Sequence, residues 1–228
     1  MNIFMTGGTG YMGSRLIPSL MARAHTVKAL VRPGSENKLP AGISPIVGDA
    51  LKLDSYTSEV RGCDTFVHLI GTPHPSPAKA KQFREVDLVS ATVAVKAARD
   101  AGVRHFVYLS VAQPAPMMKA FLEVRAQGEG MIRETGIPAT FLRPWYVLGP
   151  GHWWPYAILP FYWILELFPN TKEPAQRLGL ITIDQMSNAL LWSVENPPSG
   201  ARILDVPQIR RITKERRIQS SLNPSSSE

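Results

Sequence analysis

The chain has 228 residues, 44% of them hydrophobic, with 25 lysines and arginines against 18 acidic residues and a net charge of +7. These totals indicate one soluble globular domain of ordinary size. The single cysteine, Cys63, excludes an internal disulfide and fits a reducing compartment, so we expect a cytoplasmic protein. No signal peptide stands before the first apolar run, and no transmembrane segment is expected.

The first predicted strand, at residues 3–5, leads directly into the glycine-rich stretch TGGTGYMG. Gly7, Gly10 and Gly13 follow a G-x-x-G-x-x-G pattern at a point where a strand turns sharply into a helix. Glycines there permit the tight turn and let backbone N–H groups approach a pyrophosphate closely. The stretch therefore predicts dinucleotide binding; a glycine turn without a ligand is the alternative.

Short apolar runs alternate with helical stretches along the next 140 residues. In the longest such stretch, 79–101, the apolar residues Phe83, Val86, Val93 and Ala97 have the spacing of one buried helical face. Strands that alternate with helices predict an α/β fold, namely a Rossmann-type, doubly wound, mostly parallel sheet. The further predicted strands lie at residues 27–31, 44–47, 65–69, 105–109 and 140–142.

The end of the second predicted strand carries Arg32, near the position where an acidic residue would bind the ribose 2′-hydroxyl of NAD. A guanidinium pairs with a 2′-phosphate, which a carboxylate would repel. Lys38, and with less support Arg15, would add positive charge. The sequence thus favours NADP over NAD, and a plain surface arginine is the alternative.

The pattern changes after residue 150, so we divide the chain into a nucleotide-binding core (1–150), an aromatic-rich C-terminal lobe of the same domain (151–207) and a basic tail (208–228). The lobe opens with GHWWPYAILPFYWILELFP and is interpreted as a cap over a substrate cleft, or as a surface for a partner or a membrane interface. A strand and a helix capped by Asp184 follow, and ARILDVP ends the lobe with a last strand.

The tail holds RRITKERR at residues 210–217, whose five bases and one acid carry +4 of the net +7. Its composition predicts a disordered, solvated segment, with contact to an anionic membrane or a nucleic acid as the alternative. Because the charge is concentrated there, no nucleic-acid partner is expected for the domain itself.

With TGGTGYMG the chain resembles the atypical or extended short-chain dehydrogenases/reductases, and more narrowly the NmrA-like NAD(P)-binding proteins. GDALKLDSY, DTFVHLIG, HFVYLSV and ATFLRPWYVLGPG resemble the family segments around the third to sixth strands. The resemblance covers residues 1–150 well and the rest only in outline. It implies that the following residues contact the cofactor: Gly7, Thr9, Gly10, Tyr11, Met12, Gly13, Arg32, Asp49, Ala50, Leu69, Ile70, Gly71, Ser110, Arg125 and Pro144.

The catalytic pattern of the family is altered. Carbonyl-reducing members use a tyrosine as the proton donor, a lysine four residues later and an upstream serine; here the matching residues are Phe121, Arg125 and Ser110. Phenylalanine donates no proton, and the very high pKa of an arginine prevents proton relay, although Arg125 can still bind the ribose. Ser110, Arg125 and Tyr146 are the catalytic candidates, with Tyr146 or Lys119 as a replacement acid.

The remaining polar residues indicate no further chemistry. Tyr108 lies in an apolar strand and is expected in the core, as are His68 and His105. The five histidines show no ligand spacing, so no metal site is predicted. Trp153 and Trp154 would pack in the lobe or stack on an aromatic ligand.

Two hypotheses remain open at this point. The first is an NADP-dependent oxidoreductase that acts on an unidentified small organic substrate and obtains its proton elsewhere. The second is a non-catalytic NADP(H)-binding protein, a redox sensor or an assembly or interaction factor, whose aromatic lobe binds a partner protein. The intact LRP stretch at residues 142–144 motivates the first, and the loss of the tyrosine and lysine motivates the second.

Overall fold

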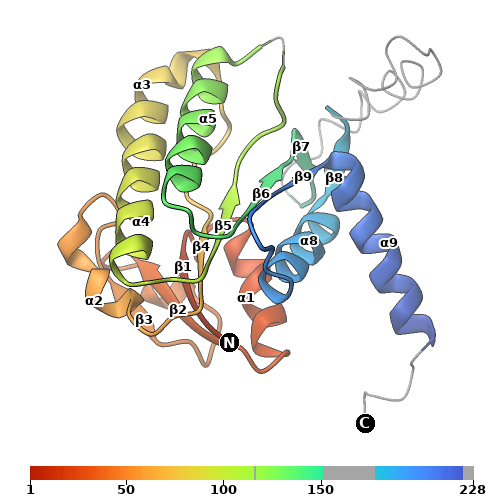
Figure 1. Cartoon of the computed structure of the whole chain (residues 1–228), viewed down its shortest axis with the longest axis horizontal. Helices are drawn as coiled ribbons and strands as arrows, with labels where there is room; N and C mark the ends of the chain where they lie inside the picture. The colour runs from red at the N-terminus through yellow and green to blue at the C-terminus, as the bar shows by residue number, and fades with distance from the viewer. Residues whose placement is uncertain (116, 151–177, 223–228) are drawn as a thin grey trace.

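The computed structural model of the chain describes residues 1–115, 117–150 and 178–222. Its centre is a seven-stranded sheet in the order β3-β2-β1-β4-β5-β6-β9, in which every pairing is parallel (Figure 1). The predicted parallel α/β fold is therefore confirmed. The strands are β1 Asn2–Thr6, β2 Thr26–Val31, β3 Pro45–Val47, β4 Thr65–His68, β5 His105–Leu109, β6 Ala139–Arg143 and β9 Ala201–Asp205.

Helices cover both faces of this sheet, with α1, α8 and α9 on one side and α2, α4 and α5 on the other (Figure 1). Residues of β1 alternate between the two cores: Ile3 and Met5 face the first group, and Phe4 faces the second. Burial on both faces explains why the strands are continuous apolar runs. The helices are α1 Gly13–Met21, α2 Thr57–Val60, α3 Ala80–Gln82, α4 Val89–Asp100, α5 Lys119–Glu134, α8 Ile183–Glu195 and α9 Val206–Leu222.

The strand order reverses between β1 and β4, because the chain first adds β2 and β3 on one side of β1 and then continues on the other. In open α/β sheets this switch point leaves a crevice at the carboxyl ends of the strands. Beyond β6 the chain forms β7, Tyr146–Leu148, which pairs in parallel with β8, Leu180–Thr182. The region that includes the predicted cap, with Trp153 and Trp154, lies outside the described residues.

The single helix predicted for residues 79–101 is divided. It comprises η3 Pro77–Lys79, α3, the π-helical segment η4 Phe83–Leu88 and α4. Phe83 and Ala97 are buried as predicted, but Val86 is 36% exposed and Asp87 is fully buried. A π-turn holds more residues than an α-turn, so it shifts the side chains that follow around the helix axis. The prediction that Val86 faces the core is therefore wrong.

The cap of α8 also differs from the prediction. Thr182, rather than Asp184, precedes the helix, and its hydroxyl accepts a hydrogen bond from the backbone N–H of Gln185 at 3.2 Å. The side chain of Gln185 accepts one in return from the backbone N–H of Thr182 at 2.9 Å. This reciprocal capping box satisfies two helix-terminal donors, and Asp184 lies in the first turn of the helix.

The prediction of a disordered tail from residue 208 is wrong up to Leu222, because the basic segment lies on α9. Val206, Ile209 and Ile212 are buried at helical spacing, and α9 packs against α8. Arg216 of α9 also pairs with Glu195 of α8 at 2.8 Å. Within the described part of the chain, no helix is both long and apolar enough to cross a membrane.

Candidate functional site

The glycine-rich turn joins β1 to α1 at the carboxyl edge of the sheet. Gly7 has a φ of +80°, and the N–H of Gly10 donates to its carbonyl oxygen at 3.0 Å. A β-carbon on Gly13 would lie 2.6 Å from the Cα of Gly8, so the first turn of the helix packs directly on the loop. No side chain caps the start of α1 and no acidic residue lies in its first turn. Its terminal N–H groups are therefore suited to an anion.

A cavity of about 500 Å³ lies beside this turn. It extends from the ends of β1 and β2 to the loop that follows β4, across the switch point. Nine of the predicted cofactor residues line it, and they are Gly7, Thr9, Gly10, Arg32, Asp49, Ala50, Leu69, Ile70 and Gly71. Eight further residues line it that were not among the predicted cofactor contacts, namely Leu30, Val31, Gly48, Leu51, Thr72, Pro73, Gln82 and Val86.

One end of the cavity carries a positive charge. Arg32 follows β2, is exposed to solvent and makes no ion pair with any residue in the described part of the chain. Asp49, which follows β3, uses one carboxylate oxygen to accept the N–H of Leu51 at 3.0 Å. The hydroxyl of Ser55 fixes this turn by donating to the carbonyl of Asp49 at 2.7 Å. Arg32 is therefore available to a ligand, whereas one oxygen of Asp49 is already engaged.

Six predicted cofactor residues do not line this cavity: Tyr11, Met12, Gly13, Ser110, Arg125 and Pro144. Tyr11 stacks under the guanidinium of Arg15, 4.2 Å from the ring centre, and its carbonyl accepts a hydrogen bond from the same side chain. Arg15 is thus held against the turn. Tyr146, the candidate acid, is half-buried on β7 and is also absent from the lining.

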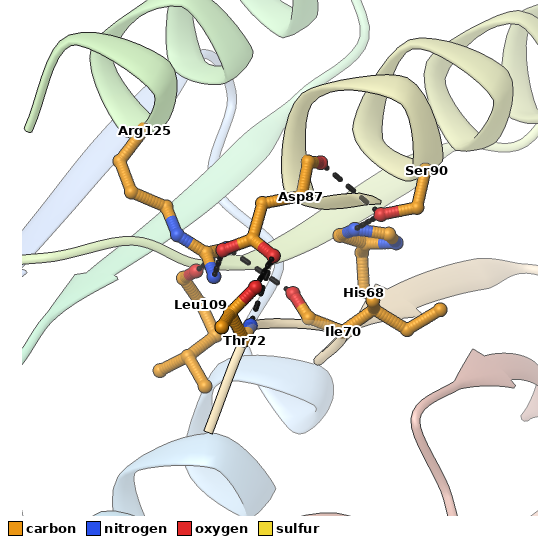
Figure 2. A network of polar contacts seen from close by, with 7 residues as sticks. All are labelled: His68, Ile70, Thr72, Asp87, Ser90, Leu109 and Arg125. Atoms are coloured by element: carbon orange, nitrogen blue, oxygen red, sulfur yellow. Dashed lines mark hydrogen bonds and ion pairs between the residues drawn. The ribbon is translucent and has the colours of Figure 1, made fainter. Parts of the chain in front are cut away.

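Arg125 projects from α5 toward the loop after β4, as Figure 2 shows. Its guanidinium donates to Asp87 and to the backbone carbonyls of Ile70 and Leu109. Phe121 lies one turn earlier on α5, against Phe83, with ring centres 4.9 Å apart. Phe121 and Arg125, which match the family's catalytic tyrosine and lysine, thus both pack against other protein groups.

Ser110 donates its hydroxyl to Glu129 at 2.6 Å. The buried Glu129 carboxylate also accepts from Gln113, Arg133 and Arg143, at distances between 2.6 and 3.0 Å. Burial raises the pKa of Glu129, but the hydrogen bonds from Arg143 and Ser110 outweigh burial, so its pKa lies below the usual value. Arg133 could have been identified from the sequence as a partner of Glu129, because residues four apart on a helix lie side by side. No nearby residue in the sequence indicated Gln113 as a partner.

The two histidines expected in the core are buried there. Burial lowers the pKa of His68 to about 3 and that of His105 to about 4. The Nδ1 atom of His68 lies 2.8 Å from the Thr6 hydroxyl, and its ring stacks on Tyr108. Tyr108 itself is fully buried, and burial raises its pKa. Among the described residues no cluster of histidine, cysteine and acidic side chains has the make-up of a metal site.

These histidines predict a specific acid sensitivity. In the unfolded chain His68 takes up a proton near pH 6.5, whereas in the folded chain its pKa is about 3. The contribution of the neutral histidine to the free energy of unfolding is therefore fully present above pH 6.5. It falls as the pH drops, by about 1.4 kcal/mol per pH unit for each such histidine. Urea unfolding at several pH values measures how the free energy of unfolding depends on pH below 6.5. This dependence should be shallower for His68→Gln than for the wild type. The exposed His74→Asn is the control, and equal slopes for all three proteins would contradict the assignment.

Comparison with known proteins identifies related sequences. Residues 7–150 match the family model described as NAD(P)H-binding. The chain is 25% identical over 171 residues to 4-hydroxy-2-methyl-3-oxo-4-farnesyl-3,4-dihydroquinoline-1-oxide ketoreductase of Stigmatella aurantiaca, a match that covers 65% of this chain and 51% of that protein. It is 22% identical over 211 residues to ceramide reductase of Caulobacter vibrioides, covering 92% and 65% respectively. The chain thus spans about half to two thirds of the length of these two relatives.

Among solved structures, the chain is similar to a short-chain dehydrogenase/reductase superfamily protein from Agrobacterium tumefaciens with bound NAD. The TM-score is 0.66 at 16% identity, and the match covers 94% of this chain and 83% of the other. At this identity the similarity establishes a shared fold.

Proposed function

Because the chain belongs to the NAD(P)H-binding family, we propose that it binds NADP(H) in the cavity beside the glycine turn and acts as an oxidoreductase on a small organic substrate. The cavity itself carries this proposal. It lies at the switch point of a parallel sheet, with Gly7, Thr9 and Gly10 of the glycine turn in its lining and Arg32 at one end. This is where the fold places the pyrophosphate and the adenosine of a dinucleotide.

Arg32 supports NADP rather than NAD. Its exposed guanidinium lies at the end of β2, where the adenosine ribose is expected, and it is free of any ion pair with the described residues. A 2′-phosphate there would accept charge-assisted hydrogen bonds from it. Lys38, in η1 Glu36–Lys38, is exposed and adds positive charge in the same loop.

When bound, the nicotinamide of the cofactor supplies or accepts a hydride. The side chains at the usual proton-donating positions do not move a proton, since Phe121 has none to give and the Arg125 guanidinium is held by three protein acceptors. The Ser110 hydroxyl donates to Glu129, so its remaining role toward a substrate is as an acceptor. We assign proton donation to Tyr146 on β7 or to water. The names of the two relatives, a ketoreductase and a reductase, support a carbonyl group in the substrate.

The second candidate function is a non-catalytic NADP(H)-binding protein. The engagement of both Ser110 and Arg125 with protein partners favours it, whereas the reductase names of the relatives favour the oxidoreductase. Measuring NADPH consumption with a panel of ketones and aldehydes separates the two. Tight NADPH binding without turnover of any of them would support the second candidate.

Cytoplasmic location and a small molecule or protein partner at the aromatic lobe remain predictions from the sequence. The single cysteine, Cys63, is free and buried, as a reducing compartment allows.

Replacing Arg32 tests the nucleotide site. We expect Arg32→Ala to weaken NADPH binding by about tenfold or more, because a hydrogen bond to a charged group contributes about 1.5–3 kcal/mol. NADH, which lacks the 2′-phosphate, should bind equally to both proteins. The measurement is a fluorescence titration of each nucleotide, with Arg99→Ala at the end of α4 as the matched control. An equal loss for NADH and NADPH would exclude a phosphate contact.

A further inference from the structure

Arg125 matches the lysine that holds the cofactor ribose in the short-chain dehydrogenases/reductases. Its guanidinium, however, points into the protein interior. Its Nη1 atom donates to the carbonyl oxygens of Ile70 at 3.2 Å and Leu109 at 3.0 Å. Its Nη2 atom donates to Oδ2 of Asp87 at 3.0 Å, and this ion pair is buried, with side-chain exposures of 4% and 0%. The guanidinium therefore connects α5 to the ends of β4 and β5 and to η4.

Asp87 continues the connection to the loop after β4. Its second carboxylate oxygen, Oδ1, accepts both the backbone N–H and the hydroxyl of Thr72, each at 2.8 Å (Figure 2). The π-helical segment η4 supplies Asp87 on the buried side of the helix. Asp87 and Arg125 together thus fix both Ile70 and Thr72, on either side of Gly71.

This ion pair lies directly behind the wall of the cavity. Ile70, Gly71 and Thr72 all line the cavity. A β-carbon on Gly71 would overlap the Arg125 guanidinium, so the wall at that point is one residue thick. Aromatic rings also confine the guanidinium, with its Cζ atom 5.1 Å from the ring centre of Phe121 and 5.8 Å from that of Tyr108. The neutralised, enclosed pair is suited to holding the wall rather than to contacting an anion.

We infer that Arg125 and Asp87 are positioning residues that hold the Ile70–Thr72 wall in the shape required by the complete dinucleotide. This inference rests on the proposed function, because it concerns the same cavity. The wall follows β4, on the opposite side of the switch point from Arg32, where the second mononucleotide half is expected. The pair should therefore affect NADPH more than 2′,5′-ADP, which the glycine turn and Arg32 hold.

The test is the double variant Asp87→Val/Arg125→Met. Replacing both partners with apolar residues leaves no buried unpaired charge, so the protein is expected to fold. Its melting temperature should be lower than that of the wild type, because Thr72 and the carbonyls of Ile70 and Leu109 lose their hydrogen-bond partners. We expect its NADPH dissociation constant to rise about tenfold or more, and that of 2′,5′-ADP to change less than about threefold. Isothermal titration calorimetry with both compounds gives the two constants.

A control double variant removes a partly buried ion pair between two helices, neither residue of which lines the cavity. Arg216→Met/Glu195→Leu breaks the contact between α9 and α8 and should change neither constant. If the first double variant does not fold, Asp87→Asn/Arg125→Gln carries the test, because it also leaves no unpaired buried charge and keeps polar side chains beside Thr72 and the carbonyls of Ile70 and Leu109.

The outcomes separate the two proposals. A selective loss of NADPH affinity supports the positioning role. A folded double variant that binds both compounds as the wild type does would overturn it, and so would an equal loss for both, since that indicates a general effect on the fold. A wild-type protein that binds neither compound would overturn the proposed function itself, before any substitution is made.

Discussion

Replacing Gly13 with alanine is expected to weaken nucleotide binding strongly and to destabilise the fold. The new β-carbon would lie 2.6 Å from Cα of Gly8 and 2.8 Å from its carbonyl oxygen. These are backbone atoms of the turn, so no side chain can move aside and the turn and α1 must separate. Overpacking of this kind lowers the free energy of unfolding by about 3 kcal/mol or more. A displaced turn would lose backbone hydrogen bonds to the phosphates, and the loss of two such bonds, each contributing about 1.5–3 kcal/mol, would weaken NADPH binding about 100-fold or more.

Chemical denaturation and NADPH titration measure the two effects. The matched control is Gly130→Ala, because Gly130 lies on α5 and a β-carbon there would meet no atom within 4 Å. That substitution should raise stability by about 0.5–1 kcal/mol through helix propensity alone and leave binding unchanged. Wild-type affinity in the Gly13→Ala protein would refute the assignment of the turn to the nucleotide.

Replacing Glu129 with glutamine is expected to be the most damaging change outside the turn. Glu129 is 1% exposed, and its carboxylate accepts hydrogen bonds from Ser110, Gln113, Arg133 and Arg143. Removing its charge breaks the ion pair of Arg143, whose side chain is only 15% exposed, and leaves Asp205 as the acidic group that still acts on it. Breaking one partner of a buried pair lowers the free energy of unfolding by about 3–5 kcal/mol.

The control for this prediction is Arg133→Gln. Arg133 contacts the same carboxylate at 2.9 Å, but its side chain is 40% exposed, so its loss should lower stability by less than about 1 kcal/mol. Urea denaturation of the three proteins gives the comparison, and similar losses for both variants would count against a special role for Glu129.

The pH dependence provides a second observable for the same residue. The pKa of Glu129 is lowered in the folded protein, so its carboxylate binds fewer protons there than in the unfolded chain. Its contribution is fully present above the ordinary carboxyl pKa and is lost as the pH falls through the lowered folded value. The Glu129→Gln protein should lack this part of the acid destabilisation and keep the part that begins near pH 6.5, where the buried histidines act.

The sequence by itself determined the fold, the family and much of the cavity. The resemblance seen in TGGTGYMG is confirmed by the NAD(P)H-binding family match and by the short-chain dehydrogenase/reductase fold. Each of the strands predicted at residues 3–5, 27–31, 65–69, 105–109 and 140–142 coincides with an observed strand, and their ends agree within two residues. These features are local: an apolar run, a glycine turn and a residue at a strand end depend on neighbours in the chain.

Local composition was misleading where a few residues decide the structure. The tail is polar on average, yet Ile209 and Ile212, with Val206 just before the tail, are buried at helical spacing on α9, which packs against α8. Likewise, Asp184 is a good capping residue by type, but Thr182 and Gln185 have the three-residue spacing that closes the capping box.

Only the tertiary structure decided which charges meet. Arg125 and Asp87 are 38 residues apart, and Ser110 and Glu129 are 19 apart, on elements that the parallel sheet brings side by side. The sequence showed that an arginine replaces the family's lysine, but not that its guanidinium donates to a buried carboxylate and to two backbone carbonyls. These contacts depend on the π-turn of η4, which rotates Asp87 inward, and on Gly71, which leaves room for the guanidinium behind the cavity wall. No residue adjacent in sequence encodes such a contact, because it exists only when three separate elements pack together.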